Sequence, residues 1–439
     1  MKSYSTLPLG EKIYEIRKAK GLSQENMAQA LNTNRMTISR IERGETECSA
    51  HNLALIRQFL DIEKTPLLEH ELQLYEGKLR VWYQLVATAR GSEAKAMQEE
   101  MAIILDLPFE ADLYQQYLAI EAWLLCKYGN ISATEDKLNT LEPMLGSASA
   151  TVRYLFHLLK GFLYSMAGDN KKFLKHSIIA LNYRDATINP EVAALYNISQ
   201  AYLMLGKPFH AIVYLERAQS EFKGDVTNTS MSSINHTLAS CYVWICDYDK
   251  AEKLAEASLA QAKSLNATGR MADVSYVLSN IKLQTYRYEE CMAHCEQAIL
   301  HYKELNESYI DVLIVKAHCL LEMNEYEKCK QVLAQGKAII DEEKIPTPGM
   351  AFDEDSLSIQ LNATGHLMTL DSPDSINYIQ NTAIPQLRDG GLSKFEALYF
   401  CNKLEAHYTK KRTKTKANAI AAIARDIYRE IYEGEVEFD

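Results

Sequence analysis

The sequence lacks the marks of an exported or membrane-spanning protein. No apolar segment follows Lys2 within the first 27 residues, as a secretory signal would require. No apolar run approaches the ~18 residues that span a membrane. Nine cysteines are scattered without a regular framework. We therefore expect reduced thiols, a cytoplasmic location and no membrane contact.

The motifs of common enzymes are also missing. There is no P-loop, dinucleotide fingerprint, HExxH or nucleophile motif. Cys291, His294 and Cys295 have a helical spacing that would let them face one metal ion, but no second ligand cluster accompanies them. We interpret them as packing residues, and we predict no enzymatic activity, no cofactor and no metal site.

An overall excess of positive charge is absent as well. The formal net charge of the 439 residues is -11, yet residues 1–64 carry 10 basic and 8 acidic side chains, a balance of +2. The length favours several domains or a repeat array over a single core. We predict a small basic head on a large acidic body, so any attraction for phosphate is local.

Four short helical segments fill the first 60 residues. Apolar periodicity and capping residues predict them at about 9–20, 24–30, 35–42 and 50–60. Ser23 and Asn34 suit the N-caps of the second and third helices, and Asn32 tolerates the positive φ of the turn between them. Two short helices joined by a tight turn inside a small bundle are typical of a helix-turn-helix.

The string KIYEIRKAKGLSQENMAQALNTNRMTISRIERG resembles the phage-repressor class of helix-turn-helix proteins, also called the XRE or Cro/C1 type. The likeness rests on the GLSQ and TISRIERG elements together with the helix spacing. Asn32 stands where that class usually has glycine. Arg17 and Glu42 match a pair that forms an internal salt bridge in the class, so the resemblance implies a structural role for both.

The resemblance and the helical geometry place the same side chains on a DNA-reading face. Arg35 and Arg40 are expected to read guanine edges, and Met36 to contact a thymine methyl group. One module makes few contacts, so we expect a homodimer on double-stranded DNA at an inverted-repeat operator. The predicted DNA-binding residues are Gln24, Arg35, Met36, Thr37, Ser39, Arg40 and Arg43.

From residue 67 onward the pattern is helix after helix, with four similar segments at 193–218, 233–258, 273–298 and 311–336. Small residues recur at fixed positions in each copy, which lets paired helices approach closely, and the region resembles tetratricopeptide (TPR) hairpins. We predict an all-α fold: a helix-turn-helix bundle over 1–64, then a TPR-like right-handed superhelix with a concave groove over 65–439. We expect an IPTPG turn at 345–349 to interrupt the array.

A phage-repressor-type head on a divergent TPR array resembles the RNPP quorum-sensing regulators (the Rap, NprR, PlcR and PrgX group) and their phage-encoded relatives. The resemblance implies that the groove binds a short signalling peptide, which alters the dimer or its grip on DNA. A second hypothesis is a scaffold or anti-activator whose groove sequesters a partner protein.

The first helix of each hairpin is expected to line the groove. Asn and Gln suit an extended peptide because each amide both donates and accepts hydrogen bonds. Asn197, in LYNIS, is similar to the groove asparagine that holds peptide backbone in the family, whereas Trp244 is better interpreted as packing between repeats. The predicted peptide-binding residues are Tyr196, Asn197, Gln200, His236, Ser240, Trp244, Tyr276, Asn280, Gln284 and His318.

Overall fold

Helices make up all the regular structure in the part of the chain that the computed structural model describes, and no strand occurs there. This confirms the all-α prediction. The chain divides into two compact units, 1–160 and 161–439, and the predicted turn at 345–349 lies outside the described residues. None of the described helices is long and apolar enough to cross a lipid bilayer. The described residues are 8–60, 69–87, 90–106, 110–183, 190–222, 229–302, 307–341, 354–390 and 393–433.

A four-helix bundle opens the first unit, and local signals set its turns. The Ser23 hydroxyl accepts a hydrogen bond from the backbone N–H of Asn26, whose side chain accepts one from the Ser23 N–H in return. Asn32 has a φ of 50° in the turn that follows. Ile13, Met27 and Ile38 meet in the core of the bundle. Its helices are α1 (Leu9–Ala19), α2 (Gln24–Ala30), α3 (Arg35–Glu42) and α4 (Ala50–Phe59).

Two helical hairpins follow the bundle in the first unit. The indole N–H of buried Trp82 donates to the carbonyl of Ala94 at 2.8 Å and ties the first hairpin together. A ninth helix, α9 (Ala150–Met166), contains the point where the two units divide. The hairpin elements are α5 (Glu69–Ala87), α6 (Gly91–Met101), η1 (Ala102–Asp106), α7 (Ala111–Lys127), α8 (Ile131–Leu141) and η2 (Glu142–Ser147).

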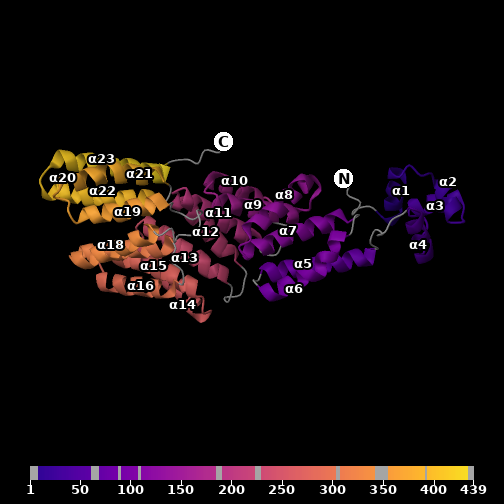
Figure 1. Cartoon of the computed structure of the whole chain (residues 1–439), viewed down its shortest axis with the longest axis horizontal. Helices are drawn as coiled ribbons and strands as arrows, with labels where there is room; N and C mark the ends of the chain where they lie inside the picture. Colours follow the sequence, from indigo (N-terminus) through magenta and orange to yellow (C-terminus); the bar gives the residue numbers. More distant parts are fainter. Residues whose placement is uncertain are drawn as a thin grey trace. The chain divides into compact units, whose positions relative to one another are not determined.

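The second unit continues the hairpins with the expected period. One residue with positive φ sits at each turn between paired helices, at Gly168, Gly206, Cys246, Tyr286 and Asn324. The small residues predicted at one packing position, Ser199, Ala239, Ser279 and Ala317, are all 0% exposed. These helices are α10 (Asn170–Leu181), α11 (Pro190–Met204), α12 (Pro208–Glu221), α13 (Thr229–Trp244), α14 (Tyr248–Ser264), α15 (Thr268–Gln284), α16 (Tyr288–His301), α17 (Glu307–Glu322) and α18 (Tyr326–Asp341) (Figure 1).

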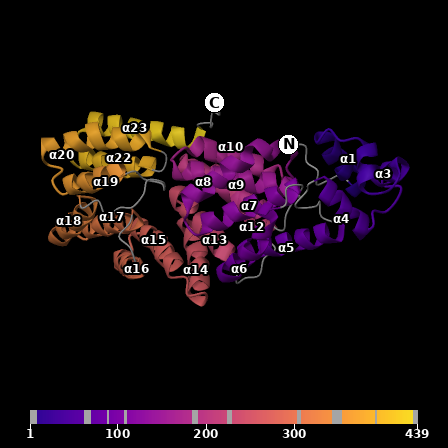
Figure 2. The same ribbon diagram turned by 45° about the vertical axis from the view of Figure 1, so that its right-hand side comes forward.

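The last helices of the second unit form a separate layer beside these repeats (Figure 2). They share a core that includes Ile379, Phe400 and Ile427. Its helix α22 provides one wall of a cavity whose other wall is formed by the repeats. Its elements are α19 (Glu354–Leu367), α20 (Pro373–Tyr378), η4 (Ile379–Ala383), α21 (Ile384–Asp389), α22 (Ser393–Lys410) and α23 (Lys414–Glu433).

Candidate functional site

The helix α3 presents its predicted reading residues outward. Asn34 caps the helix by accepting a hydrogen bond from the backbone N–H of Thr37 at 2.8 Å. Ile38 is fully buried, so the helix can only turn its other face to solvent. Arg35 and Arg40 lie on that face and are exposed, as is Met36, whose side chain is 65% exposed.

The two other predicted residues at the end of α3 are partly engaged within the protein. The Arg43 guanidinium donates to the backbone carbonyl of Ser39 at 3.2 Å and pairs with Glu45 at 3.1 Å. Arg43 remains exposed, and Ser39 is half-buried. The structure therefore leaves Arg43 free to reach a phosphate by exchanging a surface ion pair, which costs little.

A buried ion pair fixes α3 against α1. Arg17 donates to both carboxylate oxygens of Glu42, at 2.5 and 2.9 Å, and both side chains are almost fully buried. The hydrogen bond to Glu42 raises the pKa of Arg17 above its usual value. This confirms the internal salt bridge that the resemblance implied.

Gln24 extends the same pair toward the reading face, a role that the sequence did not reveal. Its amide donates to Glu42 at 2.7 Å, and its amide oxygen accepts from Arg35 at 3.5 Å. Gln24 is therefore held between the buried pair and a predicted base-reading arginine. Gln24 follows the N-cap residue of α2, and nothing in the sequence indicates that it contacts another helix.

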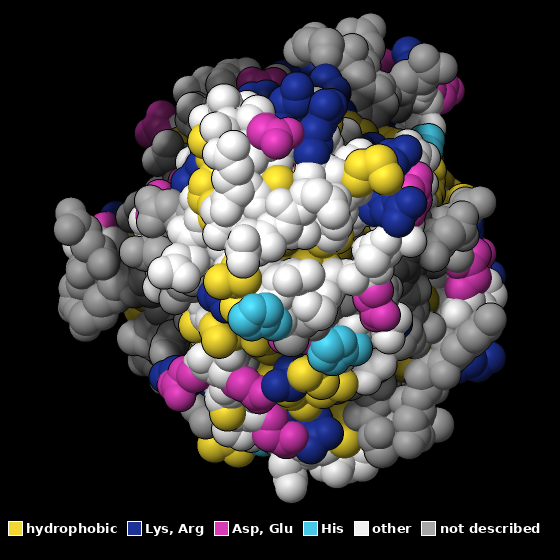
Figure 3. Space-filling view, turned by 90° about the vertical axis from the view of Figure 1, so that its right-hand side faces the viewer, with side chains coloured by type: hydrophobic (Ala, Val, Ile, Leu, Met, Phe, Trp, Pro, Cys, Tyr) yellow, Lys and Arg dark blue, Asp and Glu magenta, His cyan; other side chains and the backbone are white. Residues whose placement is uncertain are grey.

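The surface around the bundle is mixed in charge. Residues 1–64 carry 10 basic and 8 acidic side chains, and the face of the molecule in Figure 3 likewise has Lys and Arg interspersed with Asp and Glu. Such a surface gives only a weak long-range attraction for a polyanion.

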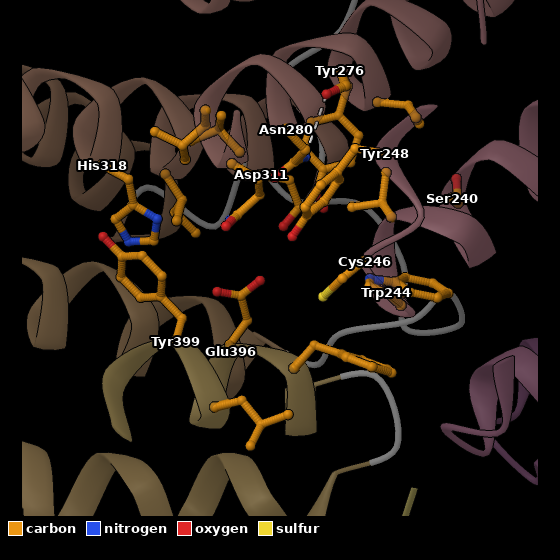
Figure 4. Close-up of a pocket in the computed structure, with 18 of the residues that line it drawn as sticks. Ser240, Trp244, Cys246, Tyr248, Tyr276, Asn280, Asp311, His318, Glu396 and Tyr399 are labelled. Carbon is orange, nitrogen blue, oxygen red and sulfur yellow. Dashed lines mark hydrogen bonds between the residues drawn. The ribbon is translucent and has the colours of Figure 1, made fainter. Parts of the chain in front are cut away.

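A cavity of about 190 Å³ lies in the second unit, between the repeats and the last helices (Figure 4). One wall is formed by α13, α15 and α17, the first helices of three hairpins, as predicted for a groove. The opposite wall is formed by Phe395, Glu396, Tyr399 and Asn402 of α22, with Tyr428 of α23. Six predicted peptide-binding residues line it: Ser240, Trp244, Tyr276, Asn280, Gln284 and His318.

The other four predicted peptide-binding residues are not among the lining of this cavity. The hydroxyl of Tyr196 and the amide of Gln200 hydrogen-bond to Thr237 on the neighbouring inner helix, at 3.3 and 3.1 Å. His236 contacts the Arg270 guanidinium at 3.2 Å, and burial lowers the pKa of His236 to about 3. Asn197 is half-buried on α11.

Aromatic stacking holds α22 against the repeats. The Trp244 ring stacks on Phe395 of α22 with centroids 5.1 Å apart, so it packs against the last helices and not only between repeats, and it also lines the cavity. The His318 ring stacks on Tyr399 at 4.1 Å. Lys403 forms an ion pair with Glu322. These contacts join segments more than 70 residues apart in the sequence and close one side of the groove.

His318 contributes a neutral ring to the cavity. Its Nε2 lies 2.9 Å from the Thr364 hydroxyl, and the residue is 4% exposed. Burial lowers the pKa of His318 to about 3. A histidine at this depth therefore supplies shape and one hydrogen bond, but no positive charge at neutral pH.

The wall formed by α22 was not predicted from the sequence. The predicted groove positions lie in the four similar segments, which end at residue 336, and Glu396 and Tyr399 follow much later. Their helix carries no repeat pattern that would place it beside α13 or α17. Only the long-range packing of the second unit brings them to the cavity.

Comparison with known proteins supports this architecture. Residues 13–67 match the family model described as Helix-turn-helix. The N-terminal segment is a helix-turn-helix domain. No curated protein matches the sequence.

Solved structures resemble the chain far beyond that domain. A Rap protein complexed with competence and sporulation factor matches with a TM-score of 0.67 and 14% identity, over 83% of this chain and 100% of that one. The apo quorum sensor NprR from B. thuringiensis matches with a TM-score of 0.63 and 18% identity, over 81% and 99%. NprR in complex with its cognate peptide NprX gives 0.61 and 17%, over 83% and 100%. The resemblance to the Rap and NprR group is thus confirmed at the level of the fold.

Proposed function

We propose that this protein is a sequence-specific transcriptional regulator controlled by a short signalling peptide that binds between its repeats and α22. The helix-turn-helix domain supports the DNA-binding half of the proposal. Arg35, Met36 and Arg40 stand exposed on one face of α3, at the positions where a recognition helix meets base edges. A homodimer on an inverted repeat would supply the contacts that one such helix lacks.

The cavity lined by the inner helices is the observation that carries the peptide half. Its walls combine amide side chains, such as Asn280 and Gln284, with aromatic rings. An extended peptide has backbone N–H and C=O groups without internal hydrogen-bond partners, and side-chain amides can pair with both kinds of group. The solved structures of NprR support this choice, because NprR is a quorum sensor and one of its structures holds its cognate peptide NprX.

Control of DNA binding requires that peptide and operator favour different states of the protein. A ligand shifts an equilibrium only by its difference in affinity for the two states, and the effect is reciprocal. Saturating operator DNA must therefore change peptide affinity by the same factor as peptide changes DNA affinity.

The first test is binding-site sequencing on genomic DNA from the source cell, with and without culture supernatant. Enrichment of an inverted repeat that changes with supernatant supports the proposal. Absence of any enriched sequence, together with stable capture of one partner protein, would favour the sequestering scaffold instead.

A further inference from the structure

Three cysteine side chains meet where α16 packs against α17. Cys291 and Cys295 come from α16 and Cys319 comes from α17, and all three are free thiols that are 0% exposed. They share one core cluster with apolar side chains such as Val315. None of the three lines the cavity or belongs to the helix-turn-helix bundle. The cluster therefore has no part in either of the two sites described above.

The course of α16 brings Cys291 in particular next to Cys319. The thiol of Cys319 donates a hydrogen bond to the backbone carbonyl of Tyr288 at 3.4 Å, in the first turn of α16. Side chains of an α-helix lean toward its N-terminus, so Cys291 covers the turn that begins at Tyr288. Cys295 follows four residues later, about one turn farther from that carbonyl. Cys291 is therefore the thiol of α16 that the helix places closest to Cys319.

The thiols of this cluster differ in acidity. Cys319 accepts a hydrogen bond from Cys291, and this bond lowers the pKa of Cys319 below its ordinary value. Hydrogen bonds to Cys295 and Cys319 raise the pKa of Cys291. Burial raises the pKa of Cys329, an equally buried thiol on α18, to about 11. Because the thiolate is the nucleophilic form of cysteine, Cys319 is the reactive member of the cluster.

A small oxidant has only a short way to travel to Cys319. The thiol lies directly beneath the first turn of α16, at the carbonyl of Tyr288. Tyr288 is half-buried, and the next two residues, Glu289 and Glu290, are exposed. Terminal helical turns open at a far lower cost in free energy than the core of a domain. Local opening of this turn therefore suffices to admit a molecule as small as hydrogen peroxide.

We propose that Cys319 and Cys291 form a peroxide-sensitive pair that closes a disulfide between α16 and α17. The Cys319 thiolate attacks one oxygen of hydrogen peroxide, the O–O bond breaks, and hydroxide leaves, so that Cys319 becomes a sulfenic acid. The sulfur of Cys291 then attacks the sulfur of Cys319, the S–O bond breaks, and the hydroxyl group leaves as water with the proton of Cys291. The two thiols lose two electrons and two protons, and one peroxide is reduced to two molecules of water.

The disulfide acts next to the wall of the cavity. Cys319 follows His318, which lines the cavity and stacks on Tyr399 of α22 with ring centroids 4.1 Å apart (Figure 4). A covalent tether at Cys319 removes movements of α17 relative to α16 and so limits how this wall can adjust. The inference goes beyond the proposed function, because the pair responds to peroxide whichever ligand the cavity takes.

The test uses the full-length protein, first reduced and then freed of reductant. It is exposed to graded hydrogen peroxide and denatured in N-ethylmaleimide, and the disulfides are mapped by mass spectrometry after digestion. We expect the first intramolecular disulfide to join Cys291 to Cys319 and to be reversed by dithiothreitol. Cys329 and Cys401, which are equally buried, should still be alkylated at that stage. Oxidation of the exposed Cys246 is counted separately.

Three variants assign the order of the two steps. Cys291→Ala removes the thiol that closes the bond, so Cys319 should remain a sulfenic acid that dimedone traps. Cys319→Ala removes the thiol that is oxidised first, so Cys291 should stay reduced. Cys329→Ala is the matched control, since it removes a buried thiol outside the pair and should leave oxidation as in wild type.

Amide hydrogen exchange measures the effect of the bond on the fold without any variant. The tether closes the loop from Cys291 to Cys319, so exchange that requires separation of α16 and α17 should slow by roughly a hundredfold in the oxidised protein. A first disulfide between other cysteines would overturn the proposal. Loss of Cys319 no faster than loss of Cys329 and Cys401 would overturn it as well.

Discussion

The helix-turn-helix and the cavity are built in opposite ways. The reading face of α3 takes all its outward side chains from eight consecutive residues, on a surface that one capped turn and one buried ion pair hold in place. The cavity draws its lining from Ser240 to Tyr428, and two separate layers must pack before it exists. The reading face of α3 should therefore keep its shape when distant parts of the chain move, whereas the cavity changes shape when its two layers shift. This difference suits the two proposed roles, a surface that reads DNA and a cavity that responds to a ligand.

The largest effect should come from breaking the ion pair behind α3. Glu42→Ala leaves the Arg17 guanidinium buried without its carboxylate, which should cost about 3–5 kcal/mol of bundle stability. Amide hydrogen exchange across residues 8–60 measures this loss, and operator binding should disappear with it.

Replacing both partners by Met is the matched control, since removing the two charges together is close to neutral in other proteins. A Glu42→Ala bundle as protected as wild type would show that α3 does not depend on this pair.

The stability of the second unit should depend on pH through Glu396. Its pKa of about 7, against an ordinary 4.5, means that folding is penalised as pH rises from 4.5 to 7 and the buried carboxyl ionises. Glu396→Gln should therefore stabilise the protein at pH 8, by up to roughly 3 kcal/mol, and have little effect at pH 4.5. Urea unfolding at the two pH values measures the difference. An equal effect at both would contradict the assigned burial.

The two arginines of α3 should matter to DNA and not to the sensor. Arg35→Ala and Arg40→Ala should each cost roughly 1–3 kcal/mol in operator affinity and relax specificity at one base position. Gel shifts with single-base operator variants resolve this. Gln24→Ala serves as the comparison, because loss of its contacts to Glu42 and Arg35 should weaken all sites evenly. Normal footprints from the double arginine variant would rule out α3 as the reader.

Asn280 and Asn197 distinguish the cavity from the wider groove. Asn280 lines the cavity, so Asn280→Ala should weaken peptide binding by about 1–3 kcal/mol through unpaired peptide amides. Sequence reasoning predicts the same for Asn197→Ala on α11. Calorimetry with a peptide that binds the wild-type protein compares the affinities of the two variants. Weaker binding in both variants would place part of the peptide along α11, whereas weaker binding in Asn280→Ala alone would place its contacts at the cavity.

The smallest effect concerns the turns between paired helices. Gly168 has a φ of 76° with no atom near the place of a Cβ, so Gly168→Ala should cost about 1 kcal/mol from backbone strain alone. Tyr286 has a φ of 59° at the equivalent turn, and Tyr286→Gly should cost less or stabilise. Thermal unfolding curves of the two variants, each compared with wild type, measure these changes in stability. A larger loss in Tyr286→Gly would mean that its exposed ring makes a contact that strain does not describe.

Sequence reasoning recovered what is encoded locally. The caps at Ser23 and Asn34, the turn at Asn32 and the small residues at helix contacts each act on near neighbours, so their types suffice to predict them. The position of Glu396 was beyond reach, because it depends on α22 stacking against helices about 80 to 150 residues earlier, and no periodicity records that pairing.

Cys246 gives the cavity a natural reporter. It is the one exposed thiol of the nine cysteines, and it lies at the rim of the cavity beside Trp244. A maleimide dye should therefore label the native protein at this position first, next to an intrinsic fluorophore whose ring contacts α22. Because Cys246 lines the cavity, the rate at which the thiol is labelled should fall when the cavity is filled, which gives an assay for occupancy without any engineered residue.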